Sequence, residues 1–264
     1  NTMAARSKVN RHKLGNSVIQ LVGNSDLNQA ISYLDIASPL SGGTYSNFDI
    51  DSDSFSASLW VKLFHTGIST DYNYSISILS QTDNNGGFAS LSGAGTGRGL
   101  LSSNVGTGQF SCNLGNVSRL SGFVPQPNVW YFVNLIRNKV AGTLGYYVNG
   151  QAYNQFTGVT SFESCTGKIH IGANRGIVRS MDGYVFKPRF AAGVAYTQAQ
   201  IQALYLNDIF AGTKEFELLC GEKALPFVDT GVHAYAVDVH NGAGIALNQS
   251  PFLARTKVSR SKVA

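Results

Sequence analysis

The sequence has few charged side chains, and glutamate in particular is scarce. Charged residues make up 13% of the 264 residues, and glutamate occurs four times. Glycine, by contrast, occurs 29 times, and serine and asparagine are abundant. Glutamate is a strong helix former, whereas glycine, serine and asparagine supply turn conformations. This composition therefore favours short strands joined by many turns over helices. A chain of this length can bury the core of one large domain.

Two further kinds of feature are missing. The sequence has no run of eighteen apolar residues, so it predicts no membrane-spanning helix. Its three cysteines are Cys112, Cys165 and Cys220, which are far apart and show no CxxC spacing, so a zinc site or a redox pair is not expected. Cys112 and Cys165 could pair across two strands, but we favour buried thiols that behave as small apolar side chains.

Positive charge is concentrated at the two ends of the chain. Residues 1–16 and 251–264 each carry four basic side chains and no acid, while the rest has 12 basic and 15 acidic residues. The tetrapeptide RSKV occurs in both ends, at 6–9 and 260–263. We predict basic arms at 1–15 and 251–264 that contact nucleic acid or neighbouring subunits; the alternative is ordinary solvated chain ends. The basic residues of the arms are Arg6, Lys8, Arg11, Lys13, Arg255, Lys257, Arg260 and Lys262.

Apolar and polar residues alternate through most of the sequence, as in half-buried strands. The segment SASLWVKLF at 56–64 places Leu59, Val61 and Leu63 on one face. Similar segments are separated by turn clusters such as TDNNGG at 82–87 and the Asn-Gly pair at 149–150. Many short strands with closely spaced turns predict an all-β antiparallel sandwich.

One segment follows a helical period instead. In TQAQIQALYLNDIFAG, three apolar residues fall on one helical stripe: Ile201, Leu204 and Tyr205. Thr197 followed by Gln200 is the pattern of a capping box, and Gly212 is a candidate stop. We predict one short helix near 198–208 that lies against the sandwich.

The order of these segments resembles a known superfamily. The segments that carry the resemblance are FSASLWVKL (55–63), ISILSQTDNNGGFASLS (76–92), WYFVNLIRN to GYYVNGQAY (130–153), GKIHIGA (167–173) and MDGYVFKPRFAAGVAYTQAQIQALY (181–205). They are similar to the laminin-G-like and pentraxin-like domains of the concanavalin A-like lectin/glucanase superfamily. The resemblance covers about residues 16–206 and implies a two-sheet antiparallel jelly-roll β-sandwich. We expect the extension at 207–250 to complete this sandwich or to extend it to a neighbouring molecule.

Catalytic motifs are missing from the sequence. Glucanases of the superfamily use paired carboxylates on one strand, and the E-x-D-x-x-E pattern that would supply them does not occur. No G-x-S-x-G occurs either, so a serine-hydrolase elbow is not supported. We therefore expect that the protein is not an enzyme.

No cofactor is predicted, with calcium as an open alternative. The candidate ligands are Asp49, Asp51, Asp53 and Asp83. The spacing of the first three is not that of an EF-hand, because Ser54 replaces the required glycine. The resemblance implies that loop aspartates and asparagines at one edge of the sandwich could bind calcium. The competing interpretation is that these residues begin a strand and a hairpin.

The resemblance also implies carbohydrate binding through aromatic platforms. The candidate glycan contacts are Tyr72, Tyr74, Phe88 and Tyr146, with Tyr147 and Tyr153 as further aromatic candidates. The competing interpretation places most of these rings in the core or at an interface.

Two function classes follow, with a degenerate or unfamiliar glycoside hydrolase as a third hypothesis. The main hypothesis is a non-enzymatic structural β-sandwich, a virion capsid, coat or decoration subunit that self-assembles. The alternative is a lectin-like carbohydrate-binding module, secreted or at the cell surface, with or without calcium. The expected location is accordingly a virion or an extracellular surface.

Overall fold

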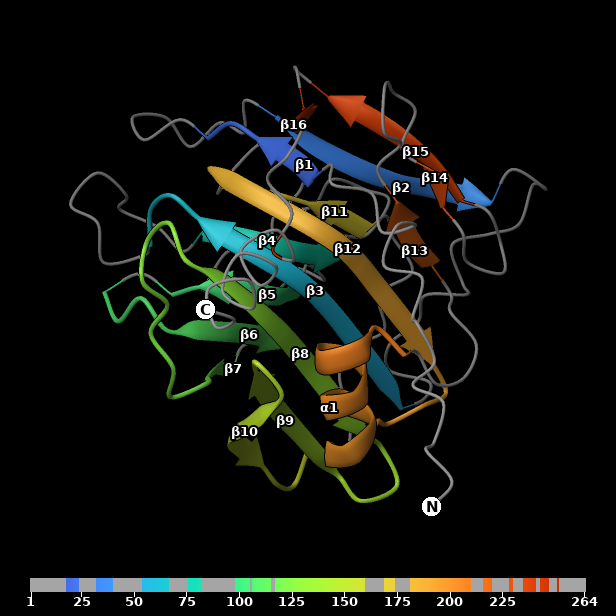
Figure 1. The fold of residues 1–264 in the computed structure, drawn as a ribbon. Coiled ribbons are helices and arrows are strands. Elements are labelled where there is room, and N and C mark those ends of the chain that lie inside the picture. The colour runs from blue at the N-terminus through green and yellow to red at the C-terminus, as the bar shows by residue number, and fades with distance from the viewer. Residues whose placement is uncertain are drawn as a thin grey trace, which may run out of the picture.

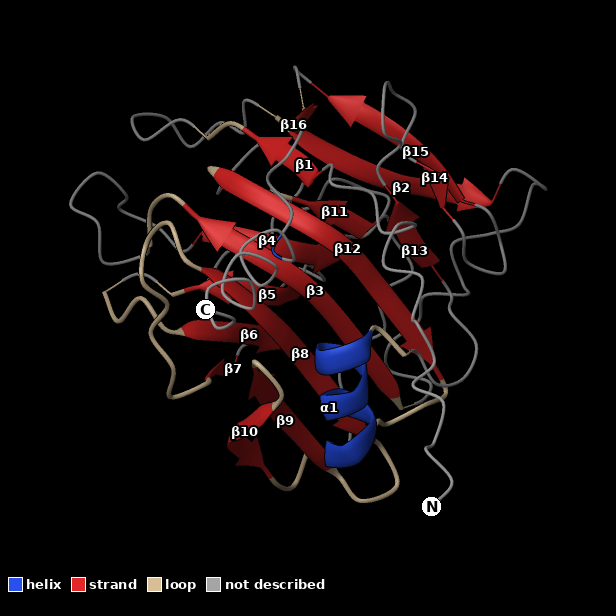
Figure 2. Ribbon diagram, viewed as in Figure 1, coloured by secondary structure: helices blue, strands red, loops and turns tan. Residues whose placement is uncertain are grey.

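A computed structural model shows two antiparallel sheets packed face to face, with one short helix on the outside (Figures 1 and 2). The structure describes residues 18–23, 32–39, 54–66, 76–81, 98–104, 106–114, 117–159, 169–173, 181–209, 216–219, 228–229, 235–240, 243–246 and 251. The basic residues of both predicted arms lie outside these residues, and so does most of each arm.

The first sheet has nine strands among the described residues. Seven run in the order β10, β9, β8, β3, β12, β1 and β16; β13 also pairs with β12, and β14 pairs with β13. Their bounds are β1 Val18–Leu21, β3 Phe55–Leu63, β8 Trp130–Asn138, β9 Thr143–Val148, β10 Gln151–Phe156, β12 Gly183–Ala192, β13 Phe216–Leu219, β14 Val228–Asp229 and β16 Gly244–Ala246. We call this the nine-stranded sheet.

The second sheet has seven strands among the described residues, in the order β15, β2, β11, β4, β5, β6 and β7. Their bounds are β2 Tyr33–Pro39, β4 Ile76–Gln81, β5 Arg98–Ser103, β6 Phe110–Leu114, β7 Val117–Leu120, β11 Ile169–Ile171 and β15 Tyr235–His240. All strand pairs among the described residues are antiparallel, so the predicted all-β antiparallel sandwich is confirmed.

The main core lies between the two sheets and follows the predicted alternation. Leu59, Val61 and Leu63 of β3 face it, together with Ile78 of β4. Cys112 is fully buried in the same core, as expected for a thiol that packs as a small apolar side chain. Successive side chains of a strand point to opposite faces of its sheet. The other side chains of β3 therefore point to the outer face of the nine-stranded sheet.

A second apolar cluster covers part of that outer face and seats the helix. Helix α1, Gln198–Asn207, buries Ile201 and Leu204 there. Its Tyr205 ring stacks on Trp60, with ring centroids 5.5 Å apart, and on Phe132 at 5.8 Å. Figure 1 shows α1 lying across the outer side of β3 and β8.

The ends of α1 follow local rules. The predicted capping box is confirmed, because the Thr197 side chain accepts from the Gln200 amide and the Gln200 side chain accepts from the Thr197 amide. The predicted stop at Gly212 is wrong. The helix ends earlier, with Asp208 as its C-cap in the left-handed region (φ 58°), a conformation that aspartate tolerates better than most residues.

The strands after α1 pair with strands of both sheets in the same chain. β13 pairs with β12, β16 pairs with β1, and β15 pairs with β2. In Figure 1 the red β15 accordingly lies beside the blue β2. The C-terminal segment therefore builds part of this chain's own sandwich.

Helix α1 is ten residues long, and no helix among the described residues is long and apolar enough to cross a membrane.

Gly183 sets how closely β12 approaches β3. It has φ 150°, and a Cβ built on it would lie 2.1 Å from the backbone oxygen of Lys62. Any side chain at this position must push the two strands apart, and these strands carry much of the outer face.

We therefore expect Gly183→Ala to lower the free energy of unfolding by about 3 kcal/mol, since it adds a backbone clash to an unfavourable conformation. Gly158→Ala is the matched control, because Gly158 also has a positive φ (71°) but has open space where the Cβ would lie. The control should lose only about 1 kcal/mol. Equal losses in urea titrations of the two variants would contradict a role for the close approach.

Candidate functional site

One row of side chains crosses the outer face of the nine-stranded sheet beside the helix. Trp130 of β8 pairs with Lys62 of β3, Lys62 pairs with Tyr184 of β12, and Tyr184 pairs with Gln20 of β1. Directly opposed residues in antiparallel strands point to the same side of a sheet, so all four share the outer face. We call these four residues the aromatic row.

The row combines aromatic rings with one cation. The rings of Trp130 and Tyr184 are nearly parallel, with centroids 6.3 Å apart and an interplanar angle of 25°. Phe64 meets the Tyr184 ring edge-on at 5.0 Å, and the Lys62 ammonium lies 5.7 Å from the centroid of the same ring. All of these side chains are half-buried, which leaves aromatic surface in contact with solvent.

A polar pair borders the row. The Asp182 carboxylate lies 3.5 Å from Nε2 of His65, and Asp182 precedes Tyr184 by two residues. Burial raises the pKa of the Asp182 carboxyl, while His65 and a hydrogen bond from the Gly23 amide oppose the shift.

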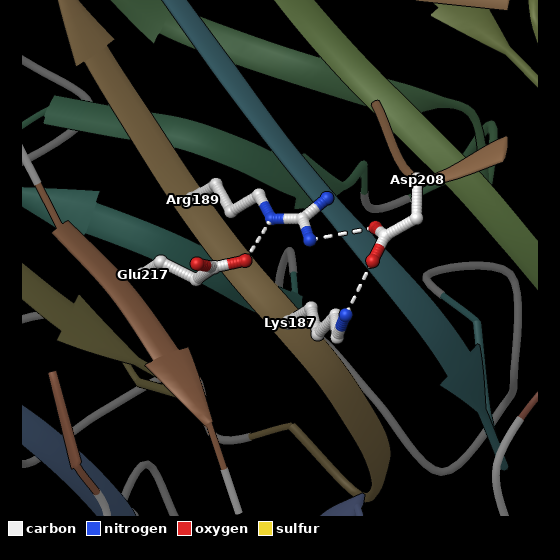
Figure 3. Close-up of polar contacts among 4 residues, drawn as sticks. All are labelled: Lys187, Arg189, Asp208 and Glu217. Carbon is white, nitrogen blue, oxygen red and sulfur yellow. Dashed lines mark hydrogen bonds and ion pairs between the residues drawn. The ribbon is translucent and has the colours of Figure 1, made fainter. Parts of the chain in front are cut away.

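The same outer face carries a buried charge network farther along β12 (Figure 3). Arg189 donates through Nε to Glu217 at 2.6 Å, and its Nη2 lies 2.6 Å from Asp208. Lys187 donates to the other oxygen of Asp208 at 2.5 Å. Figure 3 shows Arg189 held between the two carboxylates, one from the helix C-cap and one from β13. We call these four residues the charge network.

The network is a structural element. Burial lowers the pKa of Lys187, and Arg189 lowers it further, while Asp208 and Glu217 oppose the shift. Two cations and two carboxylates balance one another, and each carboxylate accepts from a cation. Both carboxylates are therefore already engaged by cations, which suits neither a general acid nor a nucleophile that must reach a substrate.

A second polar pair lies on the outer face of the seven-stranded sheet. His170 of β11 is opposite both Asp35 of β2 and Ser80 of β4, and Nδ1 of His170 contacts the Asp35 carboxylate. The order Asp, His, Ser is reminiscent of a hydrolase triad. However, Ser80 is fully buried and its hydroxyl donates to the Ala173 carbonyl at 2.8 Å, so its proton is directed away from His170.

One predicted glycan contact is wrong. Tyr146 has no exposed surface; it lies in the main core, and its hydroxyl donates to the Arg119 carbonyl at 3.1 Å. The cause is its register, because Tyr146 is opposite Leu135, whose side chain also faces the core. Of the further aromatic candidates, Tyr147 is half-buried beside the helix cluster, and Tyr153 is exposed on β10.

The remaining predicted site residues lie outside the described residues. They are the glycan candidates Tyr72, Tyr74 and Phe88 and the calcium candidates Asp49, Asp51, Asp53 and Asp83. Over the part of the chain that is described, no three His, Cys, Asp or Glu side chains gather as metal ligands.

Sequence reasoning missed the aromatic row. Each member belongs to the set of alternate residues that faces away from the core on its strand. The four members come from four strands that are distant in the sequence, so the sequence does not show that they lie together. Trp130 and Tyr184, for example, are neighbours only because β3 lies between β8 and β12.

The sequence matches a laminin G-like family of the concanavalin A-like lectin/glucanases superfamily over residues 40–202. The chain belongs to this superfamily. Its two sheets form the concanavalin A-like jelly-roll sandwich that the resemblance implied. No curated protein matches the sequence.

Solved structures share the fold at low identity. A candidate carbohydrate-binding protein from Bacteroides ovatus is 16% identical, with a TM-score of 0.56 over 89% of this chain and 60% of that one. This chain thus spans about three fifths of that protein's length. The heptameric SAP-like pentraxin from Limulus polyphemus is 14% identical, with a TM-score of 0.53 over 89% of this chain and 97% of that one. None of these proteins supports the virion hypothesis.

The charge network predicts a large effect when one member is removed. Arg189→Met should lower the free energy of unfolding by about 3–5 kcal/mol, because the Glu217 carboxylate stays buried without its cation. The double variant Arg189→Met/Glu217→Gln removes that stranded charge and should recover part of the loss. Urea titrations of both variants and of Glu217→Gln complete the cycle. A double variant no more stable than Arg189→Met would contradict the assignment.

Proposed function

We propose that this protein is a non-catalytic carbohydrate-binding module that acts outside the cell or at a surface, and that the aromatic row is its glycan-binding surface. The aromatic row itself carries the proposal. It presents two nearly parallel, half-buried rings on β8 and β12, with a lysine on the strand between them.

The chemistry of the row suits a sugar. The C–H groups on one face of a pyranose are apolar and pack against aromatic rings, while its hydroxyl groups need donors and acceptors at the rim. Lys62 supplies donors, and Gln20 supplies both donors and an acceptor. The superfamily, whose members include lectins, and the fold shared with a candidate carbohydrate-binding protein support the same class of ligand.

The described carboxylates support binding without hydrolysis. Asp208 and Glu217 are both engaged by Arg189, and Asp182 contacts His65. A glycosidase needs two carboxyl groups that flank one bond of a bound sugar. Among the described carboxyl groups, a sugar bound on the aromatic row would meet one, that of Asp182.

Glycan arrays followed by calorimetry test the proposal. Trp130→Ala and Tyr184→Ala should each weaken binding of the best array ligand about tenfold or more, which corresponds to about 1.4 kcal/mol. Gln20→Ala should weaken it less, through lost hydrogen bonds alone. Tyr153→Ala is the matched control, since Tyr153 is 41% exposed but lies on β10, away from the row.

Three results would contradict the proposal. One is an array with no ligand, and another is a loss of affinity in Tyr153→Ala but in neither row variant. The third is release of reducing ends from the bound oligosaccharide. Titrations with calcium and with a chelator should give equal affinities. An affinity that falls when a chelator is added would instead indicate a binding site that includes the predicted calcium residues Asp49, Asp51, Asp53 and Asp83.

A further inference from the structure

A polar row lies beneath the helix on the outer face, next to the charge network. Tyr147 pairs with Asn134, Asn134 pairs with Ser58, and Ser58 pairs with Arg189. Ser58 and Asn134 each lie two residues from a ring of the apolar cluster under α1, Trp60 and Phe132 respectively. They therefore point to the same covered side of the sheet.

Two members of this row are buried without hydrogen-bond partners. Asn134 has no exposed surface, and Ser58 is 2% exposed. The Oδ1 and Nδ2 atoms of Asn134 and the Oγ atom of Ser58 make no hydrogen bond to the protein. The neighbouring serine on the same face differs, because Ser56 donates to the Val194 carbonyl at 2.6 Å and accepts from the Tyr196 amide at 3.0 Å.

We infer that Ser58 and Asn134 hold buried water beneath α1. Buried amide and hydroxyl groups in native proteins are nearly always hydrogen-bonded, and those without a protein partner are usually bonded to internal water. The two side chains are paired neighbours on the same face of the adjacent strands β3 and β8, and together they offer donors and acceptors. A bound water needs two to four such partners.

The charges around the site favour a neutral occupant. Arg189 is the nearest cation in the row, and Asp208 and Glu217 already neutralise it together with Lys187. An anion placed beside Ser58 would face two carboxylates across Arg189. Water can accept and donate at once, so it matches both the hydroxyl and the amide without changing this balance.

Unfolding experiments on the full chain distinguish a bonded hydroxyl from an unbonded one. Replacing a hydroxyl that is bonded to water removes a favourable interaction, whereas replacing a buried hydroxyl that lacks any partner removes a desolvation cost. We therefore expect Ser58→Ala to lower the urea midpoint. The reference is Ser80→Ala, which removes a fully buried hydroxyl bonded to the Ala173 carbonyl and should cause a similar shift. An unchanged or raised midpoint for Ser58→Ala would overturn the inference.

High-resolution crystallography provides the second test. In the wild-type protein we expect an ordered water within hydrogen-bond distance of both Ser58 and Asn134. In Asn134→Leu, whose apolar side chain has a similar volume, this water should be lost while Ser56 keeps its bonds. A direct hydrogen bond between Ser58 and Asn134 in the wild-type protein, or a dry site, would overturn the inference even if the variants fail to fold.

Discussion

A single β-bulge in β12 decides which side chains share the outer face. Phe186 lies opposite Trp60 and Arg189 opposite Ser58, so three steps along β12 match two steps along β3. The extra residue falls at Lys187 and Pro188, where Lys187 has φ 48° and proline has no amide hydrogen to donate.

Without this bulge Arg189 would lie opposite Ala57 and point into the apolar core. With it, Arg189 reaches the carboxylates of the helix cap and β13, and the uninterrupted pairing before it aligns Tyr184 with Lys62 and Trp130.

The sequence contained enough local information for the strands, the Asn-Gly turn and the helix. The turn at Asn149 and Gly150 has positive φ at both residues, as its chemistry predicts, and the capping box at Thr197 depends only on residues three apart. The partners of each strand depend on non-local pairing, and so do its outward-facing residues. The prediction that Tyr146 contacts a glycan is wrong because an alternating pattern gives two faces without saying which is buried. The proline at 188 was the one local signal of the bulge.

The outer face divides into two parts that differ in their exposure to water. At the aromatic row the rings and Lys62 keep contact with solvent, so a ligand can displace water from apolar surface and still find hydrogen-bonding groups. Beneath α1 the helix excludes bulk solvent, and charges there are tolerated only because each cation contacts a carboxylate. The same outer face thus carries one part that is proposed to bind a ligand and another, covered by the helix, that fixes the geometry of the strands.

The C-terminal strands connect these two parts. Gln20 of the aromatic row lies on β1, which is held between β12 and β16, while Glu217 on β13 pairs with Arg189 at the far end of β12. The segment after the helix therefore supports β12 at both ends, directly through β13 and indirectly through β16 and β1. Because β12 carries Tyr184 as well as Lys187 and Arg189, a disturbance at the charge network changes the strand on which the aromatic row depends. The residues after α1 are in this way part of the structure that positions the proposed binding surface.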